Sequence, residues 1–211
     1  MKVGYANLKR LVDTYKKDID SAIAECLKNS WYIKGPAVNT FENKLSKYCK
    51  NSATTCSSGT SALLLAYEHL GIGPGDKVIV PSFTFISTAE MINKVGATPI
   101  WVDINMENYT VDIEDLQKKM DIHGYDVKAI VGVDCFGHTC DWDSIKEIAD
   151  LYCIPVIQDA AQSFGGKYKD KINGSYNLSC LSFYPAKNLF CLGDGGGVTG
   201  PKEDIDSIRM R

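Results

Sequence analysis

The sequence lacks the features that mark nucleic-acid-binding and membrane proteins. It has no dense block of lysine and arginine, and 23 basic against 26 acidic residues give a net charge of -3. Proteins that bind nucleic acid need clustered positive charge, so no nucleic-acid partner is expected. No apolar run approaches the length that crosses a bilayer, and residues 1–20 lack the apolar core of a signal peptide. We therefore expect a cytoplasmic protein with no membrane partner.

The pattern of cysteine and histidine also gives no sign of a metal site. The eight cysteines have no C-x-x-C pair among them and no histidine at zinc spacing. They are residues 26, 49, 56, 135, 140, 153, 180 and 191. Because they are scattered through apolar surroundings, we expect buried or incidental reduced thiols, with neither disulfides nor a metal.

The order of apolar segments predicts an α/β fold. Two amphipathic stretches, about residues 10–29 and 37–49, open the chain. Strand-like runs at 53–56, 77–80, 98–104, 128–134 and 155–160 then alternate with helical patterns at 61–70, 86–95, 112–120 and 141–152. Strands at 180–184 and 196–199 and a final helix follow. Such alternation predicts one three-layer α/β/α domain with a mostly parallel, mixed sheet and a helical N-terminal arm.

The residues that follow the expected strands are polar or small. They form the segments "SSGTS", "PSFTF", "DCFGH", "QDAAQS" and "YPAKN". Ligands of open α/β sheets bind beyond the carboxyl ends of the strands. The functional site is therefore expected along this edge.

The segment 58–61, Ser-Gly-Thr-Ser, lies between a strand and a helix. Free N–H groups and the positive end of the helix dipole suit a phosphate at such a place. The same residues could simply cap the helix through Ser58 or Thr60, so the segment alone leaves both functions open.

A second glycine-rich segment, "GIGPGD" at 71–76, follows a helix and precedes a strand. A dinucleotide-binding glycine loop needs the opposite order, which disfavours a dinucleotide-binding module. These glycines are expected to end the helix and turn the chain.

Two charged side chains give the strand-end pattern a chemical meaning. Asp159 ends an apolar strand, with Gln162 three residues later, and Lys187 follows a later strand between Phe183 and Leu189. Alone, Asp159 would be read as a cap or salt-bridge partner, and Lys187 as a solvated charge. Together with a phosphate cradle, they are what a pyridoxal phosphate enzyme requires: an amine for the aldehyde, an anion for the pyridine nitrogen and an anchor for the phosphate.

Five blocks of the sequence closely resemble the DegT/DnrJ/EryC1/StrS sugar aminotransferases. In chain order they are "SGTSALLLA", "PSFTFISTAE", "GATPIWVDI", "VIQDAAQSFG" and "SFYPAKNLFCLGDGGGV", and the resemblance runs from about residue 8 to the last residue. It implies a PLP-dependent transferase fold, the aspartate aminotransferase-like large domain, with pyridoxal 5'-phosphate as cofactor. Relatives continue well beyond the last residue here. Residues 1–211 are therefore expected to be the N-terminal arm and most of a truncated large domain, with the C-terminal small domain absent.

By motif position, the resemblance assigns Lys187 as the Schiff-base lysine and Asp159 as the partner of the pyridine nitrogen. It places Gln162 near the phenolic oxygen of the cofactor and stacks Phe85 on its ring. Taken alone, Phe85 could be a core residue and Gln162 a loop amide. Asp159 is expected to stay ionised, with a pKa near the ordinary carboxyl value of about 3.9.

The resemblance also implies binding residues around the phosphate and the sugar. Gly59, Thr60 and Ser182 would hold the phosphate, with the backbone N–H groups of Thr60 and Ser61 as donors; alone, Ser182 could be an ordinary strand-end hydroxyl. The segment "SWYIKGPAV" resembles one that lies near the sugar, which makes Tyr32 and Gly35 candidate substrate contacts. The glycines at 195–197 are expected to let the next strand pass close to the site.

The implied activity is the transfer of an amino group from L-glutamate to a 3-keto or 4-keto nucleotide-linked sugar, for surface polysaccharide or O-antigen biosynthesis. Lys187 favours amino transfer, because a branch of the family with histidine at this position removes a sugar hydroxyl instead. The family's sites form between two subunits, so a homodimer is expected of the full-length form. The alternative is a catalytically silent remnant that retains a cofactor-binding or structural role.

Overall fold

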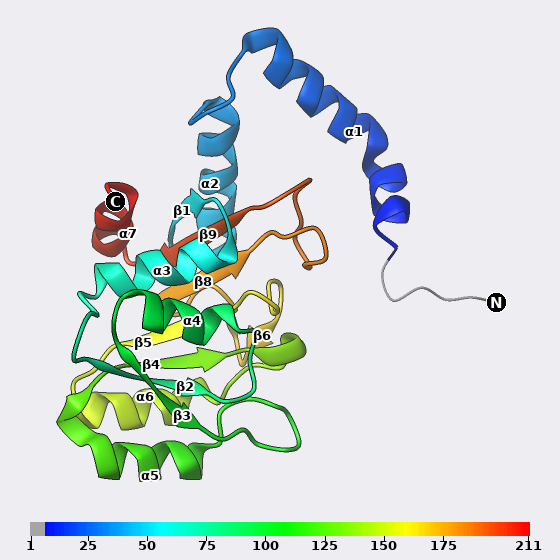
Figure 1. Ribbon diagram of the computed structural model, residues 1–211. Coiled ribbons are helices and arrows are strands. Elements are labelled where there is room, and N and C mark those ends of the chain that lie inside the picture. The colour runs from blue at the N-terminus through cyan, green and yellow to red at the C-terminus, as the bar shows by residue number, and fades with distance from the viewer. Residues whose placement is uncertain (1–6) are drawn as a thin grey trace.

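A computed structural model describes residues 7–211; the first six residues of the expected N-terminal arm lie outside the described residues. The helices are α1 (Leu8–Asn29), α2 (Pro36–Cys49), α3 (Gly59–His69), α4 (Ser87–Lys94), α5 (Ile113–His123), α6 (Trp142–Leu151) and α7 (Lys202–Arg209). The strands are β1 (Ser52–Cys56), β2 (Lys77–Pro81), β3 (Thr98–Val102), β4 (Val127–Val133), β5 (Val156–Asp159), β6 (Lys167–Tyr168), β7 (Lys171–Ile172), β8 (Leu178–Ser182) and β9 (Gly196–Gly200). Figure 1 shows their arrangement.

The main sheet has seven strands in the order β1-β9-β8-β5-β4-β2-β3. The pairs from β8 to β3 are parallel, whereas β9 is antiparallel to both of its neighbours. This confirms the expected mostly parallel, mixed sheet. At its carboxyl edge, Gly196 of β9 lies opposite both Cys56 and Ser182, so the start of β9 separates the ends of β1 and β8.

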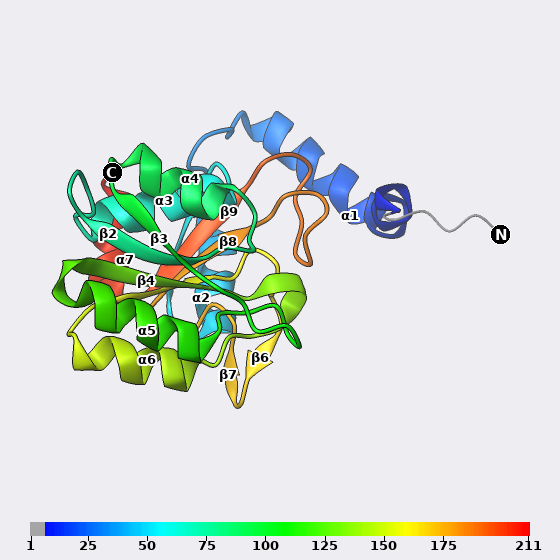
Figure 2. The same ribbon diagram turned by 60° about the horizontal axis from the view of Figure 1, so that its bottom comes forward.

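Helices cover both faces of the sheet, which gives the expected three layers (Figure 2). Alternate residues of β4 divide between two cores: Ala129 and Val131 pack with α3, α4 and α7, and Ile130 packs with α5 and α6. The helix α2 lies on the second face, where Leu45 packs against Leu181. Full burial of one such aliphatic side chain contributes about 1.5–3 kcal/mol, so the two cores hold the strand ends in place.

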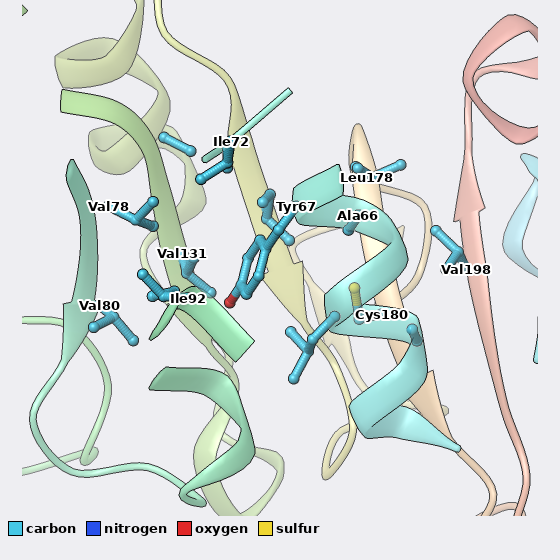
Figure 3. Close-up of a cluster of buried hydrophobic side chains, with 14 of the residues drawn as sticks. Ala66, Tyr67, Ile72, Val78, Val80, Ile92, Val131, Leu178, Cys180 and Val198 are labelled. Carbon is cyan, nitrogen blue, oxygen red and sulfur yellow. The ribbon is translucent and has the colours of Figure 1, made fainter. Parts of the chain in front are cut away.

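The helix α3 forms the centre of the first core. Figure 3 shows Tyr67 among Ile72, Val78 and Ile92. Its buried hydroxyl donates to the backbone oxygen of Thr88 at 2.9 Å, which satisfies the phenol and fixes α4 against α3. The core therefore positions the helix that follows β2.

Several elements differ from the sequence-based expectation. The strand expected at 180–184 runs from Leu178 to Ser182, and the ring of Phe183 just beyond it packs on Phe41 of α2, with ring centroids 5.2 Å apart. The two-residue strands β6 and β7 form a hairpin that no apolar run predicted. Cys153 is exposed, whereas Cys49, Cys135, Cys140 and Cys180 are buried.

The glycine-rich segment 71–76 behaves as expected. Gly71 and Gly75 have φ angles of 66° and 93°, a region that favours glycine, and they turn the chain between α3 and β2. The segment is a helix stop and a turn.

The helix α1 extends away from the body of the protein and has no buried residue (Figure 1). In the part of the chain from residue 7 onward, no helix is both long enough and apolar enough to cross a bilayer.

Candidate active site

A cavity of about 720 Å³ opens where the parallel strands end. Most of the residues predicted from the sequence line it: Gly59, Thr60, Phe85, Asp159, Gln162, Ser182 and Lys187. Ser61, Tyr32 and Gly35 are not in its lining. The fold therefore brings most of the strand-end motifs together around one space.

The N-terminus of α3 forms one wall of the cavity. Ser58 caps the helix, and its Oγ accepts a hydrogen bond from the N–H of Ser61 at 3.0 Å. Of the two expected backbone donors, Ser61 is thus engaged within the cap. Thr60 lies in the first turn, where N–H groups have no intrahelical partner, and its hydroxyl bonds to Ser87 Oγ at 2.9 Å. Capping and anion binding are both open to this segment, through different N–H groups.

Two glycines let this helix end approach the sheet closely. A Cβ atom on Gly59 would lie 2.7 Å from Ser182 Cβ, and one on Gly196 would lie 2.2 Å from the backbone carbonyl of Ser58. Neither approach is possible with a side chain present. The expectation that the glycines at 195–197 let a strand pass close to the site is confirmed at Gly196.

The carboxylate of Asp159 lies at the floor of the cavity and is only 5% exposed. Its Oδ2 accepts a hydrogen bond from the hydroxyl of Thr88 at 2.9 Å, and its Oδ1 accepts one from the N–H of Ala161 at 3.1 Å. Burial raises the pKa of Asp159 above its ordinary value, although these donors and the positive charge of Lys187 oppose the rise. Asp159 therefore ionises less readily than the sequence suggested.

The amine of Lys187 is presented by the loop that follows β8. The backbone N–H of Lys187 donates to Tyr184 O at 2.8 Å, and the side chain of Asn188 donates to Phe164 O at 3.1 Å, so the loop is fixed on both sides. None of the salt bridges formed by residues 7–211 involves Lys187. A half-buried ammonium group without an ion pair thus shares the cavity with Asp159.

Gln162, Phe136 and Phe85 also line the cavity. The backbone N–H of Phe136 donates to Gln162 Oε1 at 3.1 Å, so the Nε2 group of Gln162 is the one left to donate into the cavity. Phe136 has a φ of 54°, a strained value for a side-chain-bearing residue. Phe85 is 66% exposed although it is aromatic, which leaves its ring available to a planar ligand.

Sequence reasoning missed several lining residues. They are Leu63, Thr84, Ser87, Thr88, Phe136, Ala161, Tyr184, Ala186, Asn188, Asp194 and Gly195, together with Ser58, which was predicted only as a possible helix cap. Thr88 is the most consequential, because it bonds directly to Asp159. The run of hydroxyls in "TFIST", just after a strand, is the signal that could have identified it.

The two candidate sugar contacts lie apart from the cavity lining. Tyr32 is exposed in the segment that joins α1 to α2, and Gly35 is the N-cap of α2. Their predicted role in sugar binding stays a prediction.

The arrangement fits pyridoxal phosphate. The end of α3 suits the phosphate, Asp159 suits a cationic ring nitrogen, Lys187 suits the aldehyde, and Phe85 suits the ring. Within residues 7–211, no group of three or more His, Cys, Asp or Glu side chains could hold a metal ion.

Comparison with known proteins gives close relatives over nearly the whole chain. UDP-2-acetamido-2-deoxy-3-oxo-D-glucuronate aminotransferase of Pseudomonas aeruginosa is 42% identical over 217 residues, covering 99% of this chain and 58% of that protein. The crystal structure of DesV of S. venezuelae, in complex with a ketimine intermediate, has a TM-score of 0.95 at 37% identity, covering 99% of this chain and 56% of that one. The structure of NtdA of Bacillus subtilis with the bound cofactor PMP has a TM-score of 0.89 at 30% identity, covering 98% and 47%.

The chain therefore spans about half the length of these relatives. A sequence model of the DegT/DnrJ/EryC1/StrS aminotransferase family matches residues 13–210. The fold, the strand-end motifs and these matches agree, and the chain belongs to the DegT/DnrJ/EryC1/StrS aminotransferase family.

Proposed function

We propose that this chain carries the cofactor-binding part of a pyridoxal phosphate-dependent aminotransferase, namely the N-terminal arm and most of the large domain. The observation that carries the proposal is the meeting of Asp159, Lys187 and the N-terminus of α3 around one cavity. Each is common alone, but an amine, a buried carboxylate and an anion site in one space match a single cofactor. When bound, pyridoxal phosphate supplies an electrophilic carbon and an electron sink.

The residues of the chain would divide the work by position. The N–H of Thr60, with the hydroxyls of Thr60 and Ser182, would hold the phosphate. Asp159 would keep the ring nitrogen protonated. The positive charge of that nitrogen would in turn lower the pKa of Asp159, against the effect of burial. Gln162 Nε2 would donate to an oxygen on the opposite edge of the ring, and Phe85 would cover one ring face.

Lys187 would be the base of the reaction. Its amine would take a proton from the Cα atom of the amino donor, L-glutamate, and would deliver a proton to the C4′ carbon of the cofactor. A lysine amine titrates near about 10.4 in water, so it must lose its proton in the loaded site before it can act as a base.

The relatives suggest the class of acceptor. The name of the Pseudomonas aeruginosa protein specifies a UDP-linked 3-oxo sugar. We extend this to a 3-keto or 4-keto nucleotide-linked sugar for the present chain, acting as a homodimer and feeding surface polysaccharide biosynthesis.

The proposal is tested by labelling the cofactor lysine. The purified chain is incubated with pyridoxal phosphate, treated with borohydride to fix the cofactor to any lysine that holds it, and digested for peptide mapping. The label should fall on the peptide with Lys187 and vanish in Lys187→Ala. It should persist in Lys202→Ala, which removes an exposed lysine of α7. Absence of cofactor uptake, or labels spread over many lysines, would contradict the proposal.

Addition of L-glutamate separates the two candidate functions. An aminotransferase converts bound cofactor to the pyridoxamine form, which absorbs at shorter wavelength. A chain that takes up the label on Lys187 but shows no conversion would be the silent, cofactor-binding remnant.

A further inference from the structure

A second buried carboxylate lies behind the cavity, at the end of β4. Asp134 is fully buried and does not line the cavity. It accepts three hydrogen bonds: from the N–H of Cys140 at 2.9 Å, from Gln158 Nε2 at 2.7 Å and from Ser163 Oγ at 3.0 Å. Such a group needs an explanation, because a buried charge is retained only where its partners hold it.

The partners of Asp134 are themselves fixed in orientation. The Oε1 atom of Gln158 accepts hydrogen bonds from the N–H of Gly174 at 2.9 Å and from Ser179 Oγ at 2.8 Å. Its Nε2 group is therefore the one directed at Asp134. The N–H of Cys140 can only donate. Two of the three partners thus require an acceptor at this position, which a carboxylate supplies on both oxygens.

These hydrogen bonds tie the bases of two loops together. The bond to Cys140 closes the loop 134–140, and the bond to Ser163 attaches the end of the loop 159–163 to Asp134. The backbone N–H of Asp134 also donates to Asp159 O at 3.1 Å. At their tips the same two loops meet again, through the bond from Phe136 N–H to Gln162 Oε1.

We propose that Asp134 is a positioning residue, whose buried carboxylate locks these two loops so that Phe136 and Gln162 keep their places in the cavity. The strained φ of 54° at Phe136 supports this, because such a conformation persists only where surrounding bonds determine it. The role of Asp134 is thus exerted through Gln162, Phe136 and the backbone of Asp159. What the loops position rests on the proposed function, namely a cofactor in the cavity.

The surroundings of Asp134 oppose its charge. Burial raises the pKa of Asp134 to about 6, against its three donors. The titratable groups that face it are Asp159 at the end of β5, Cys140 in the following loop and Tyr176 before β8. Asp159 adds to the upward shift, whereas Cys140 and Tyr176 themselves have raised pKa values and stay neutral in this range.

The test compares Asp134→Asn with Met120→Ala in the 211-residue chain. The first replaces the carboxylate by an amide of the same size, and the second removes a buried side chain of α5 from the core that also contains Cys140. In D134N, amide hydrogen exchange should accelerate about tenfold in segments 134–140 and 159–164, in keeping with the loss of a charge-assisted bond. In M120A, exchange in these two segments should not accelerate more than in the rest of the chain. Ser163→Ala, which removes one donor, should accelerate segment 159–164 alone and to a smaller extent.

Pyridoxal phosphate binding gives the second measurement. The dissociation constant of D134N for the cofactor should be about tenfold higher than that of wild type at pH 8, because the amide has one acceptor oxygen where the carboxylate has two. M120A should bind the cofactor with nearly the wild-type dissociation constant at this pH. Unchanged exchange in both segments of D134N and S163A would overturn the proposal, and so would an unchanged affinity of D134N at pH 8. If wild type takes up no pyridoxal phosphate, the proposed function fails, while the exchange data still decide the role of Asp134.

Discussion

Among single residues, Thr88 has the most direct influence on the chemistry of the cavity. It is fully buried, and its hydroxyl gives Asp159 one of the two hydrogen bonds that hold the carboxylate. A hydrogen bond to a charged group contributes about 1.5–3 kcal/mol, which is comparable to the effect of burial on the ionisation of such a group.

The first prediction concerns Thr88→Val, which keeps the shape and removes the hydroxyl. With one donor fewer, the pKa of Asp159 rises further, and affinity for pyridoxal phosphate should fall roughly tenfold or more at pH 8. Absorbance titration measures this. Thr110→Val is the matched control, since Thr110 is equally buried but bonds to Asn108 away from the cavity. Equal affinities for T88V and T110V would contradict the role given to Thr88.

The second prediction concerns Gly196. Its backbone passes so near to Ser58 that a Cβ atom would lie 2.2 Å from backbone atoms, which cannot rotate away. Gly196→Ala should lower the free energy of unfolding by about 1–3 kcal/mol or more, and weaken cofactor binding by displacing the helix end. Urea unfolding and absorbance titration check both effects. Gly73→Ala, whose Cβ atom would meet only Val95 O at 3.9 Å, should change neither; a similar loss in both variants would refute the steric cause.

For single residues, the sequence predicted which side chains lie at strand ends but not which hydrogen bonds they form. Asp159 and Lys187 were found because an apolar run ends beside each of them. Thr88 and Asp134 lie in segments that the sequence analysis quoted, but their roles were not predicted, because they bond to side chains from other parts of the chain. Ser61 shows the converse, since the sequence could not tell that its N–H is used by the cap.

At the scale of elements, one ion pair joins segments from the two ends of the chain. Glu42 of α2 is buried, and its Oε2 lies 2.8 Å from Arg209 Nη2 of α7, which also donates to Ala53 O of β1. The other oxygen of Glu42 accepts the N–H of Thr55 at 2.7 Å. Burial would raise the pKa of Glu42, but the Thr55 and Arg209 bonds lower it overall. The carboxylate thus fastens α2 and α7 to the same strand.

The third prediction is that Glu42→Gln loosens this junction. Removing one partner of a buried pair is strongly destabilising, but Arg209 is 44% exposed and partly screened, so we expect a loss of about 1–2 kcal/mol at pH 7. Urea unfolding measures it. Lys202→Gln breaks an exposed pair with Asp206 in α7 and should change stability by less than about 0.5 kcal/mol. The same small change in E42Q would show that the junction contributes little.

Most elements were predictable to within a few residues, because apolar runs and helical periodicity alternate so regularly. The exceptions are informative. A two-residue strand such as β6 has too few positions to show a pattern. The end of β8 was misplaced by two residues because Phe183 resembles a strand residue: it is apolar, it packs in the same cluster as Leu181, and its N–H donates to Gly195 O at 2.8 Å.

For the molecule as a whole, Asp134 makes stability depend on pH. In the unfolded chain an aspartate loses its proton near pH 3.9, whereas in the folded chain Asp134 keeps it to about pH 6. The folded state therefore binds more protons between these values, and this contribution to the free energy of unfolding is lost as the pH rises through the window.

The fourth prediction follows from this sign. The difference between about 3.8 and about 6 corresponds to about 3 kcal/mol, so wild type should lose up to that amount relative to D134N between pH 4 and pH 7. Urea unfolding of both proteins at a series of pH values measures it. Parallel curves for the two proteins would contradict the raised pKa.

The position of β9 in the sheet also sets an order in time. Within residues 7–211, the strand β1 pairs only with β9, which the chain supplies at residues 196–200. Contacts between such distant segments form slowly, since a long loop must close first. The parallel strands from β2 to β8 can therefore assemble before β1 and the N-terminus of α3 are fixed by β9. Cofactor-binding competence would then be among the last properties that the folding chain acquires.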